Sequence, residues 1–178
     1  MPATPDPSRR SANGSRPVLG LAVATVFGVG YAPVAPGTFG SAAGLLVWWL
    51  LPASTAVQAA AIIATFLAGW WGGNVAERHF GRTDPGQVVI DEVMGMLITL
   101  FMNPVHELHG LHGLLGLVGW KGAAAGFLLF RVFDVIKPYP ANKLERLHGG
   151  LGVMADDAMA ALYANLVLRA LLWVWVSG

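Results

Sequence analysis

Carboxylates gather in three segments of this 178-residue chain, where apolar stretches begin or end. The segments are DPGQVVIDE, FRVFDVIKPYP and HGGLGVMADDAMA, and the acids expected to meet are Asp91, Glu92, Asp134, Asp156 and Asp157. Oxygen donors from separate segments suit a hard cation, because Mg²⁺ prefers carboxylates, water and phosphate oxygens. Helix capping is the alternative interpretation for the two pairs at helix starts. It does not explain Asp134, which is expected at a helix end, where the dipole disfavours a carboxylate.

Two cations flank Asp134 at helical spacing. Arg131, Asp134 and Lys137 follow one another at three-residue intervals, so neighbours in this series share a helix face. One interpretation is a salt-bridge ladder on a solvated helix end. The other is a pair of cations that hold a phosphate beside a metal ligand. Pro138 and Pro140 are expected to end the helix and to hold Lys137 in place.

A Gly- and Pro-rich segment, GVGYAPVAPGTFGS, forms the other polar feature. Thr38 and Ser41 stand just before an expected helix, where backbone N–H groups and two hydroxyls could bind an anion. An N-cap formed by either residue is the alternative. A dinucleotide-binding loop is rejected, because no strand–glycine–helix context surrounds Gly28 and Gly30.

The composition is that of a small integral membrane protein. Hydrophobic residues make up 55% of the chain and charged residues 12%, against roughly 25% charged residues in soluble domains. The mean hydropathy is +0.59. A net charge of +1 excludes a nucleic-acid binder driven by bulk charge, and the absence of cysteine excludes a thiolate metal site and a cysteine nucleophile.

We expect an all-α protein of about five main helices. The expected ranges are 41–51, 55–75, 93–105, 120–136 and 153–176. Residues 1–17 are expected to be a disordered tail, and 18–178 a single membrane domain. Pro52 and Ser54 separate the first two helices, with Thr55 as the expected cap. His106, His109 and His112 fall in a Gly-rich segment and are interpreted as a solvated loop.

The basic residues predict an orientation if the five helices alternate in direction across the bilayer. With the N-terminus inside, nine of the eleven basic residues lie on the inner side: Arg9, Arg10, Arg16, Arg78, Arg82, Arg131, Lys137, Lys143 and Arg146. The positive-inside rule therefore favours a cytoplasmic N-terminus. The same arrangement places every polar motif at helix ends on the cytoplasmic face.

Four motifs in this order and spacing resemble the phosphatidylglycerophosphatase A family from about Leu19 onward. They are APGTFGS, DPGQVVIDEVMGM, FRVFDVIKPYP and HGGLGVMADDAMA. The resemblance implies an all-α, Mg²⁺-dependent lipid phosphatase of the bacterial inner membrane. Its implied reaction converts phosphatidylglycerophosphate to phosphatidylglycerol and phosphate. The residues that match the family pattern are Asp84, Asp91, Glu92, Asp134, Lys137, Asp156 and Asp157.

The motifs and the resemblance lead to one set of expected site residues. The expected metal ligands are Asp91, Glu92, Asp134, Asp156 and Asp157, and these five together with Lys137 are the expected catalytic residues. The expected phosphate-binding residues are Thr38, Ser41, Arg131 and Lys137. Two alternatives stay open: a phosphatase of another lipid phosphate, such as phosphatidate or a polyprenyl diphosphate, and a small membrane transporter subunit.

Overall fold

The structure is a computed structural model that describes residues 17–103, 119–144, 147 and 149–177. Residues 17–24 are helical, and they are followed by η1 (Val29–Tyr31), α2 (Pro36–Leu50), α3 (Thr55–Phe80), α4 (Ile90–Leu100), α6 (Gly119–Ile136), α7 (Ala141–Leu144) and α8 (Gly150–Ser177). The described residues contain no strand, which confirms the all-α prediction. The predictions for the N-terminal tail, apart from Pro17, and for the three clustered histidines lie outside the described residues.

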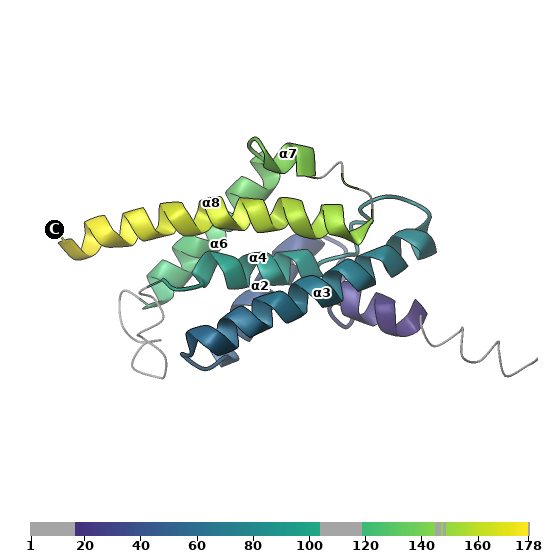
Figure 1. Ribbon diagram of the computed structural model, residues 1–178, viewed down its shortest axis with the longest axis horizontal. Coiled ribbons are helices and arrows are strands. Elements are labelled where there is room, and N and C mark those ends of the chain that lie inside the picture. Colours follow the sequence, from purple (N-terminus) through teal and green to yellow (C-terminus); the bar gives the residue numbers. More distant parts are fainter. Residues whose placement is uncertain (1–16, 104–118, 145–146, 148, 178) are drawn as a thin grey trace, which may run out of the picture.

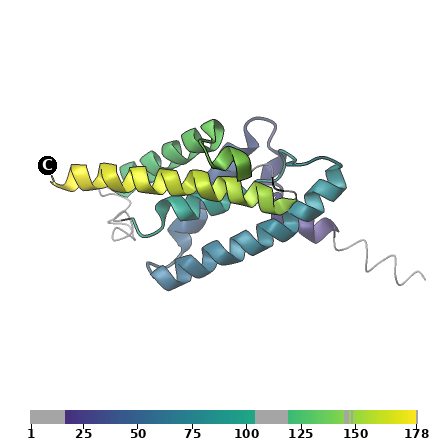
Figure 2. The ribbon, with the colours of Figure 1, turned by 45° about the horizontal axis from the view of Figure 1, so that its top comes forward.

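Helix α4 lies at the centre of the molecule. It packs against α2, α3, α6 and α8, and Figures 1 and 2 show it between the two longest helices, α3 and α8. One face of α4 joins a core around Phe130 and Leu168, and another joins a core around Ala76 and Met154. A helix that is buried on nearly all sides can hold polar side chains away from water, and α4 carries Asp91 and Glu92 at its start.

Helix α2 begins five residues earlier than the sequence indicated. Pro36 occupies its first turn, where the fixed φ of proline favours helix entry, and Ala35 precedes it without a side-chain cap. Thr38 and Ser41 therefore lie inside the helix, so the N-cap interpretation of these two residues is wrong. At the next helix, the hydroxyl oxygen of Ser54 accepts a hydrogen bond from the Val57 N–H, so the expectation of a Thr55 cap is also wrong.

Helix α8 also begins earlier than expected. It starts at Gly150, where its backbone packs directly against α3, and its first turn contains no acid. The expectation that Asp156 and Asp157 open this helix is therefore wrong, because they lie one turn or more inside it. The helix-dipole interpretation of these two acids fails for the same reason, since the dipole effect is confined to about the first turn.

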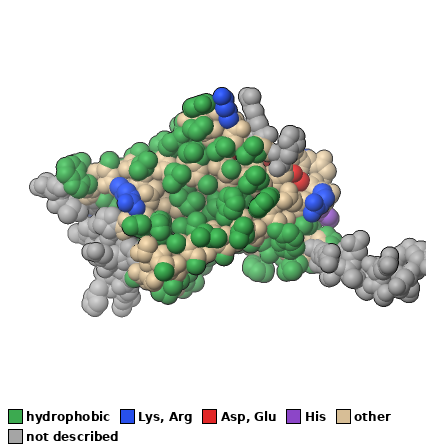
Figure 3. Space-filling model, viewed as in Figure 1, with side chains coloured by type: hydrophobic (Ala, Val, Ile, Leu, Met, Phe, Trp, Pro, Cys, Tyr) green, Lys and Arg blue, Asp and Glu red, His purple; other side chains and the backbone are tan. Residues whose placement is uncertain are grey.

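Two of the described helices are long and apolar enough to cross a membrane: α3, and α8 from Gly150 to Val174. Only 22% of the most apolar part of α3 and 39% of that of α8 is buried, so both helices expose apolar side chains. Figure 3 shows hydrophobic side chains over most of one face, with charged side chains at its margins. Helix α4 has 11 residues and spans about 16 Å, roughly half of a hydrocarbon core, so α4 does not meet the condition of five crossing helices on which the count of inner-side basic residues depends.

Candidate active site

The start of α4 carries two neighbouring acids into the protein interior. Asp91 and Glu92 lie in the first turn, as the sequence indicated, and Asp91 is only 6% exposed. The chain enters this turn through Val89, whose N–H donates to the carbonyl of Ala24 at 2.9 Å. Val88 and Val89 are themselves buried, so the entry to α4 is held by apolar packing as well as by a backbone hydrogen bond.

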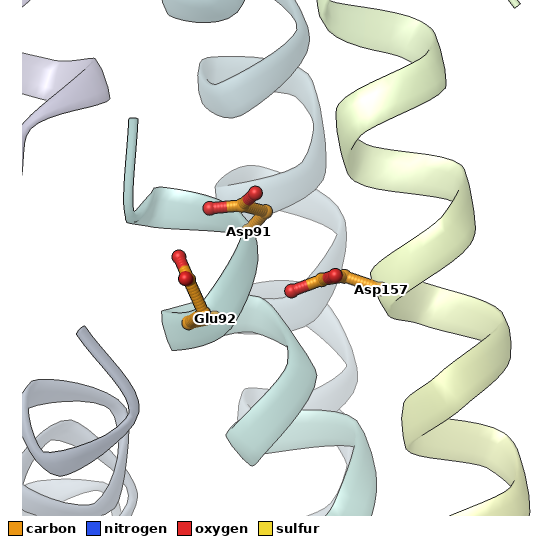
Figure 4. A group of neighbouring side chains, drawn as sticks. All are labelled: Asp91, Glu92 and Asp157. Atoms are coloured by element: carbon orange, nitrogen blue, oxygen red, sulfur yellow. The ribbon is translucent and has the colours of Figure 1, made fainter. Parts of the chain in front are cut away.

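Helix α8 brings a third acid to the same place. Carboxylate oxygens of Asp91, Glu92 and Asp157 all lie within 4.8 Å of one another, and we call these three residues the carboxylate cluster. In Figure 4 the side chain of Asp157 extends from α8 toward the two acids at the start of α4. Asp157 is 3% exposed. Two segments that are 65 residues apart in the chain thus place three acids side by side.

Buried oxygens in this region lack partners. Among the described residues, Asp91 Oδ1, Glu92 Oε2, Asp156 Oδ1 and Asp157 Oδ2 are buried and accept no hydrogen bond. An unpaired carboxylate is costly to bury, because it loses its hydration without gaining a compensating charge. A divalent cation would supply that charge, and carboxylate oxygens are the donors that Mg²⁺, Ca²⁺ and Mn²⁺ accept. The cluster therefore fits a hard cation.

The electrostatics of α4 support the same conclusion. Burial raises the pKa of Asp91 well above its usual value, and the neighbouring Glu92 raises it further. Burial also raises the pKa of Glu92 to about 7; Asp157 and Asp134 add to the increase, whereas a hydrogen bond with Asp91 and the charge of Arg131 oppose it. Mutual repulsion of this kind disfavours ionisation until a positive charge is present.

Arg131 links three elements beside the cluster. Its guanidinium lies 2.8 Å from an Asp134 carboxylate oxygen and 3.8 Å from a Glu92 oxygen. It also donates to the hydroxyl of Ser41 at 3.4 Å, and that hydroxyl donates to the Gly37 carbonyl. The predicted salt bridge between Arg131 and Asp134 is confirmed. However, Arg131 also reaches Glu92 of the carboxylate cluster, and these side chains are mostly buried, so the pair is not part of a solvent-exposed series of salt bridges.

Lys137 has a different partner from the one suggested by helical spacing. Helix α6 ends at Ile136, and Lys137 has a φ of 43°, so it lies outside the helix as the prolines predicted. Its ammonium group pairs with Asp156 on α8. Asp156 is 2% exposed and keeps a second oxygen without a partner. Lys137 and Asp156 thus form an ion pair next to the carboxylate cluster.

The first turn of α2 covers the cluster from another side. A Cβ on Gly37 would collide with Glu92 Oε1 and lie 3.1 Å from the Arg131 guanidinium, so a larger residue here would displace these two side chains. Thr38 is exposed in the same turn, whereas Ser41 is fully buried. Sequence reasoning did not single out Gly37. The motif APGTFGS contained a signal, because its first glycine, Gly37, stands in a helix, where glycine is unfavourable unless close packing requires it.

The structure sorts the expected site residues into groups. Asp91, Glu92 and Asp157 form the cluster, Asp134 lies beside it with Arg131 and Ser41, and Asp156 pairs with Lys137. Thr38 lies at the exposed start of α2. Asp84 is exposed in the loop before α4, where its N–H donates to Glu77. Five acids therefore approach one region, but only three of them share oxygens at metal-binding spacing.

Comparison with known proteins identifies the chain. The family model described as "Phosphatidylglycerophosphatase A" matches residues 22–172. The chain belongs to this family. All three carboxylate segments and the APGTFGS motif fall inside the match, which confirms the resemblance drawn from the motifs. The protein is therefore a member of a family of lipid phosphatases.

Relatives of the phosphatidylglycerophosphatase A family align with nearly the whole chain. The chain is 31% identical to phosphatidylglycerophosphatase A of Escherichia coli (100% of this chain, 96% of the relative). It is 35% identical to phosphatidylglycerophosphatase A of Haemophilus influenzae (84% and 86%). It is also 35% identical to a Bacteroides thetaiotaomicron protein provisionally named a phosphatidylinositol-3-phosphatase (88% and 95%). No solved structure matches the chain significantly.

Proposed function

We propose that this protein is a Mg²⁺-dependent membrane phosphatase that hydrolyses phosphatidylglycerophosphate to phosphatidylglycerol and inorganic phosphate. One observation carries the proposal: in a chain of this phosphatase family, three carboxylates have oxygens within 4.8 Å of one another, and each of the three has a buried oxygen that accepts no hydrogen bond. Asp91, Glu92 and Asp157 would hold the cation, with Asp134 and Asp156 within reach of the bound phosphate or its water. When bound, the cation would supply positive charge to the phosphate oxygens.

The surrounding side chains have separate tasks in this proposal. Lys137 and Arg131 place two further positive charges beside the cluster, which stabilise the charge that develops during phosphoryl transfer. The Thr38 hydroxyl and the N–H groups of the first turn of α2 contact the phosphate from its exposed side. Ser41 orients Arg131 through its hydroxyl. These residues restrict the position of the phosphate before the bond to the glycerol oxygen breaks.

Water is the proposed nucleophile. The chain contains no cysteine, and the buried Ser41 hydroxyl is already bound to Gly37 and Arg131. A carboxylate of the site accepts the proton of the attacking water, and the glycerol oxygen leaves with a proton returned from solvent or from the site. An aspartyl-phosphate intermediate is the alternative, and trapping with borohydride, which reduces an aspartyl phosphate to homoserine, would reveal it.

The location follows from the same features. We propose an inner-membrane protein whose α3 and α8 cross the bilayer and whose cluster opens to the cytoplasm. Basic residues near the cluster support this orientation, since Arg78 lies in the last turn of α3 and Lys137 pairs with Asp156 on α8. Cysteines introduced at Arg82 and Asn142 should be shielded from an impermeant reagent added outside intact cells, and one at Gly110 should react. The reverse pattern would overturn this orientation.

The head group needs a direct test, because one relative is named for a phosphoinositide. Purified protein should release phosphate from phosphatidylglycerophosphate faster than from phosphatidylinositol-3-phosphate, phosphatidate or a polyprenyl diphosphate. Release should stop with EDTA and return with Mg²⁺. Faster release from phosphatidylinositol-3-phosphate would contradict the proposed substrate and identify the phosphoinositide as the preferred one. Release that survives exhaustive EDTA treatment would contradict the metal role.

A further inference from the structure

The backbones of α3 and α8 meet without side chains between them. A Cβ on Gly73 would lie 2.8 Å from the Cα of Gly150, and a Cβ on Gly150 would lie 2.5 Å from the Trp70 carbonyl oxygen. Four residues earlier on α3, a Cβ on Gly69 would lie 2.3 Å from the sulfur of Met154. Contacts this close bring the two backbones together, but glycines carry no side chains that interlock along the helix axis, so a directional bond is needed to fix the axial position of α8.

Asn74 adds a directional bond at the same place. Its Oδ1 accepts a hydrogen bond from the N–H of Gly150 at 3.1 Å, and its Nδ2 donates to the Trp70 carbonyl at 2.8 Å. Gly150 is the first residue of α8, whose initial N–H groups have no partner within the helix. The preceding Gly149 has no side chain that could accept such a bond. Asn74 lies on α3 but therefore acts in part as an N-cap for α8, because its side-chain oxygen accepts the hydrogen bond of the first N–H of that helix.

The start of α8 determines where Asp157 lies. Asp157 follows Gly150 by seven residues of one continuous helix, which is two turns or about 10 Å. The partner acids Asp91 and Glu92 are held separately, through the bond between Val89 and Ala24. An axial shift of α8 at Gly150 would therefore move Asp157 relative to the other two acids and open the cluster.

We propose that Asn74 is a positioning residue for the cation site: it anchors the first residue of α8 to α3 and thereby holds Asp157 at binding distance from Asp91 and Glu92. The proposal rests on the function proposed above, since it assumes that the cluster binds a divalent cation. Asn74 itself is outside the carboxylate cluster. Its effect is expected on cation affinity, which a purely local loss of stability would leave unchanged.

Three variants separate the anchor from a general weakening of α3. Asn74→Ala removes the acceptor for Gly150, whereas Asn74→Asp keeps an oxygen at that position. Thr65→Val is the matched control, because Thr65 also makes one side-chain hydrogen bond on α3, to the carbonyl of Ala61 at 2.7 Å, within the helix. Mn²⁺ affinity measured by electron paramagnetic resonance reads the cluster directly, with Mn²⁺ as the spectroscopic probe. Hydrogen exchange over residues 149–157 reads the anchor without any cation.

Asn74→Ala should weaken Mn²⁺ binding on the order of tenfold, as removal of supporting groups does at other metal sites. It should also speed exchange at the start of α8, while Thr65→Val stays near the wild type in both measurements. Asn74→Asp keeps the acceptor for Gly150 but loses the donor to the Trp70 carbonyl, so it should fall between the wild type and Asn74→Ala. Wild-type affinity and exchange in a folded Asn74→Ala protein would overturn the proposal. Asn74→Ser, whose hydroxyl is too short to reach Gly150, carries the same test if the alanine variant does not fold. Wild-type protein that binds no Mn²⁺ would refute the proposed function, and unchanged exchange in the variant would refute the anchor separately.

Discussion

The polar groups at the two ends of the α4–α8 contact differ in whether the protein supplies their hydrogen-bond partners. At the end of α4, Asn165 on α8 donates to the carbonyls of Ile98, Thr99 and Phe101 at 2.9–3.0 Å. Arg169 donates to the Asn165 side chain at 2.8 Å and to the Phe101 carbonyl at 3.1 Å. At the start of α4, by contrast, the carboxylate cluster contains buried oxygens with no partner among the described residues.

This difference in hydrogen bonding distinguishes the polar groups that stabilise the fold, at the end of α4, from those available to a ligand, at its start. The carbonyls at the end of a helix need donors, and a cation there also suits the dipole, so Asn165 and Arg169 complete α4 with groups from the protein itself. Three acids at the start exceed what a helix dipole can offset. A bound cation would supply the missing charge at this end of α4, whereas the other end needs none.

Asp157→Asn should have the largest effect on turnover. The amide keeps the shape of the side chain but removes a charge that holds the cation, so activity should fall about a hundredfold or more. The folded protein should be retained, because removing one of three neighbouring charges relieves repulsion. Initial rates over a Mg²⁺ series, with thermal melts of the same samples, measure both effects. Near-normal turnover at low Mg²⁺ would remove Asp157 from the site.

Asp134→Asn should have a smaller effect, about tenfold on turnover, because Asp134 lies beside the cluster and acts partly through Arg131. The pair is 2.8 Å apart, so the variant releases a guanidinium that also faces Glu92. Arg131→Lys provides the comparison, since a lysine keeps the charge but cannot span the same partners. A hundredfold loss that excess Mg²⁺ rescues would instead make Asp134 a direct ligand.

The cation-free protein should lose stability as the pH rises. The folded protein favours protonated Glu92, whose pKa is raised from 4.5 to about 7. The contribution of Glu92 to the free energy of unfolding is therefore greatest below pH 4.5 and is lost as the pH rises through about 7. Melting temperatures in EDTA should therefore fall between about pH 5 and about pH 8, and Mg²⁺ should reduce the fall. If the melting temperature fell equally with and without Mg²⁺, the pH dependence would arise from groups outside the carboxylate cluster.

Asn165→Leu should change turnover least. It leaves carbonyls at the end of α4 without a donor, which should lower the free energy of unfolding by about 1–3 kcal/mol. Turnover per folded molecule should stay at the wild-type value, because the carboxylate cluster lies at the other end of α4. Denaturation and initial rates on the same preparation test this. A large loss of turnover in folded protein would contradict the separation of the two ends.

Most of the fold could be predicted from apolar periodicity, prolines and glycines. Helix α6 begins and ends within one residue of the expectation, and α3 begins at Thr55 as expected. The starts of α2, α4 and α8 were misplaced by five, three and three residues, and α4 ends at Leu100, five residues before the expected end. At α8 the cause is tertiary, since Gly150 starts the helix against Gly73 and Asn74. Local patterns cannot report a cap that comes from another helix.

The site shows the same division. Residue types and spacing along the chain were sufficient to select five acids, two cations and a hydroxyl-bearing turn, because such groups are rare in an apolar chain and need a partner or a task. They could not show that Asp91, Glu92 and Asp157 share one cluster while Lys137 takes Asp156 and Arg131 takes Asp134. Those pairings depend on how α4, α6 and α8 are rotated and shifted against one another. Packing between helices far apart in the chain sets that rotation and shift, down to backbone contacts that only a glycine at 73 or 150 permits.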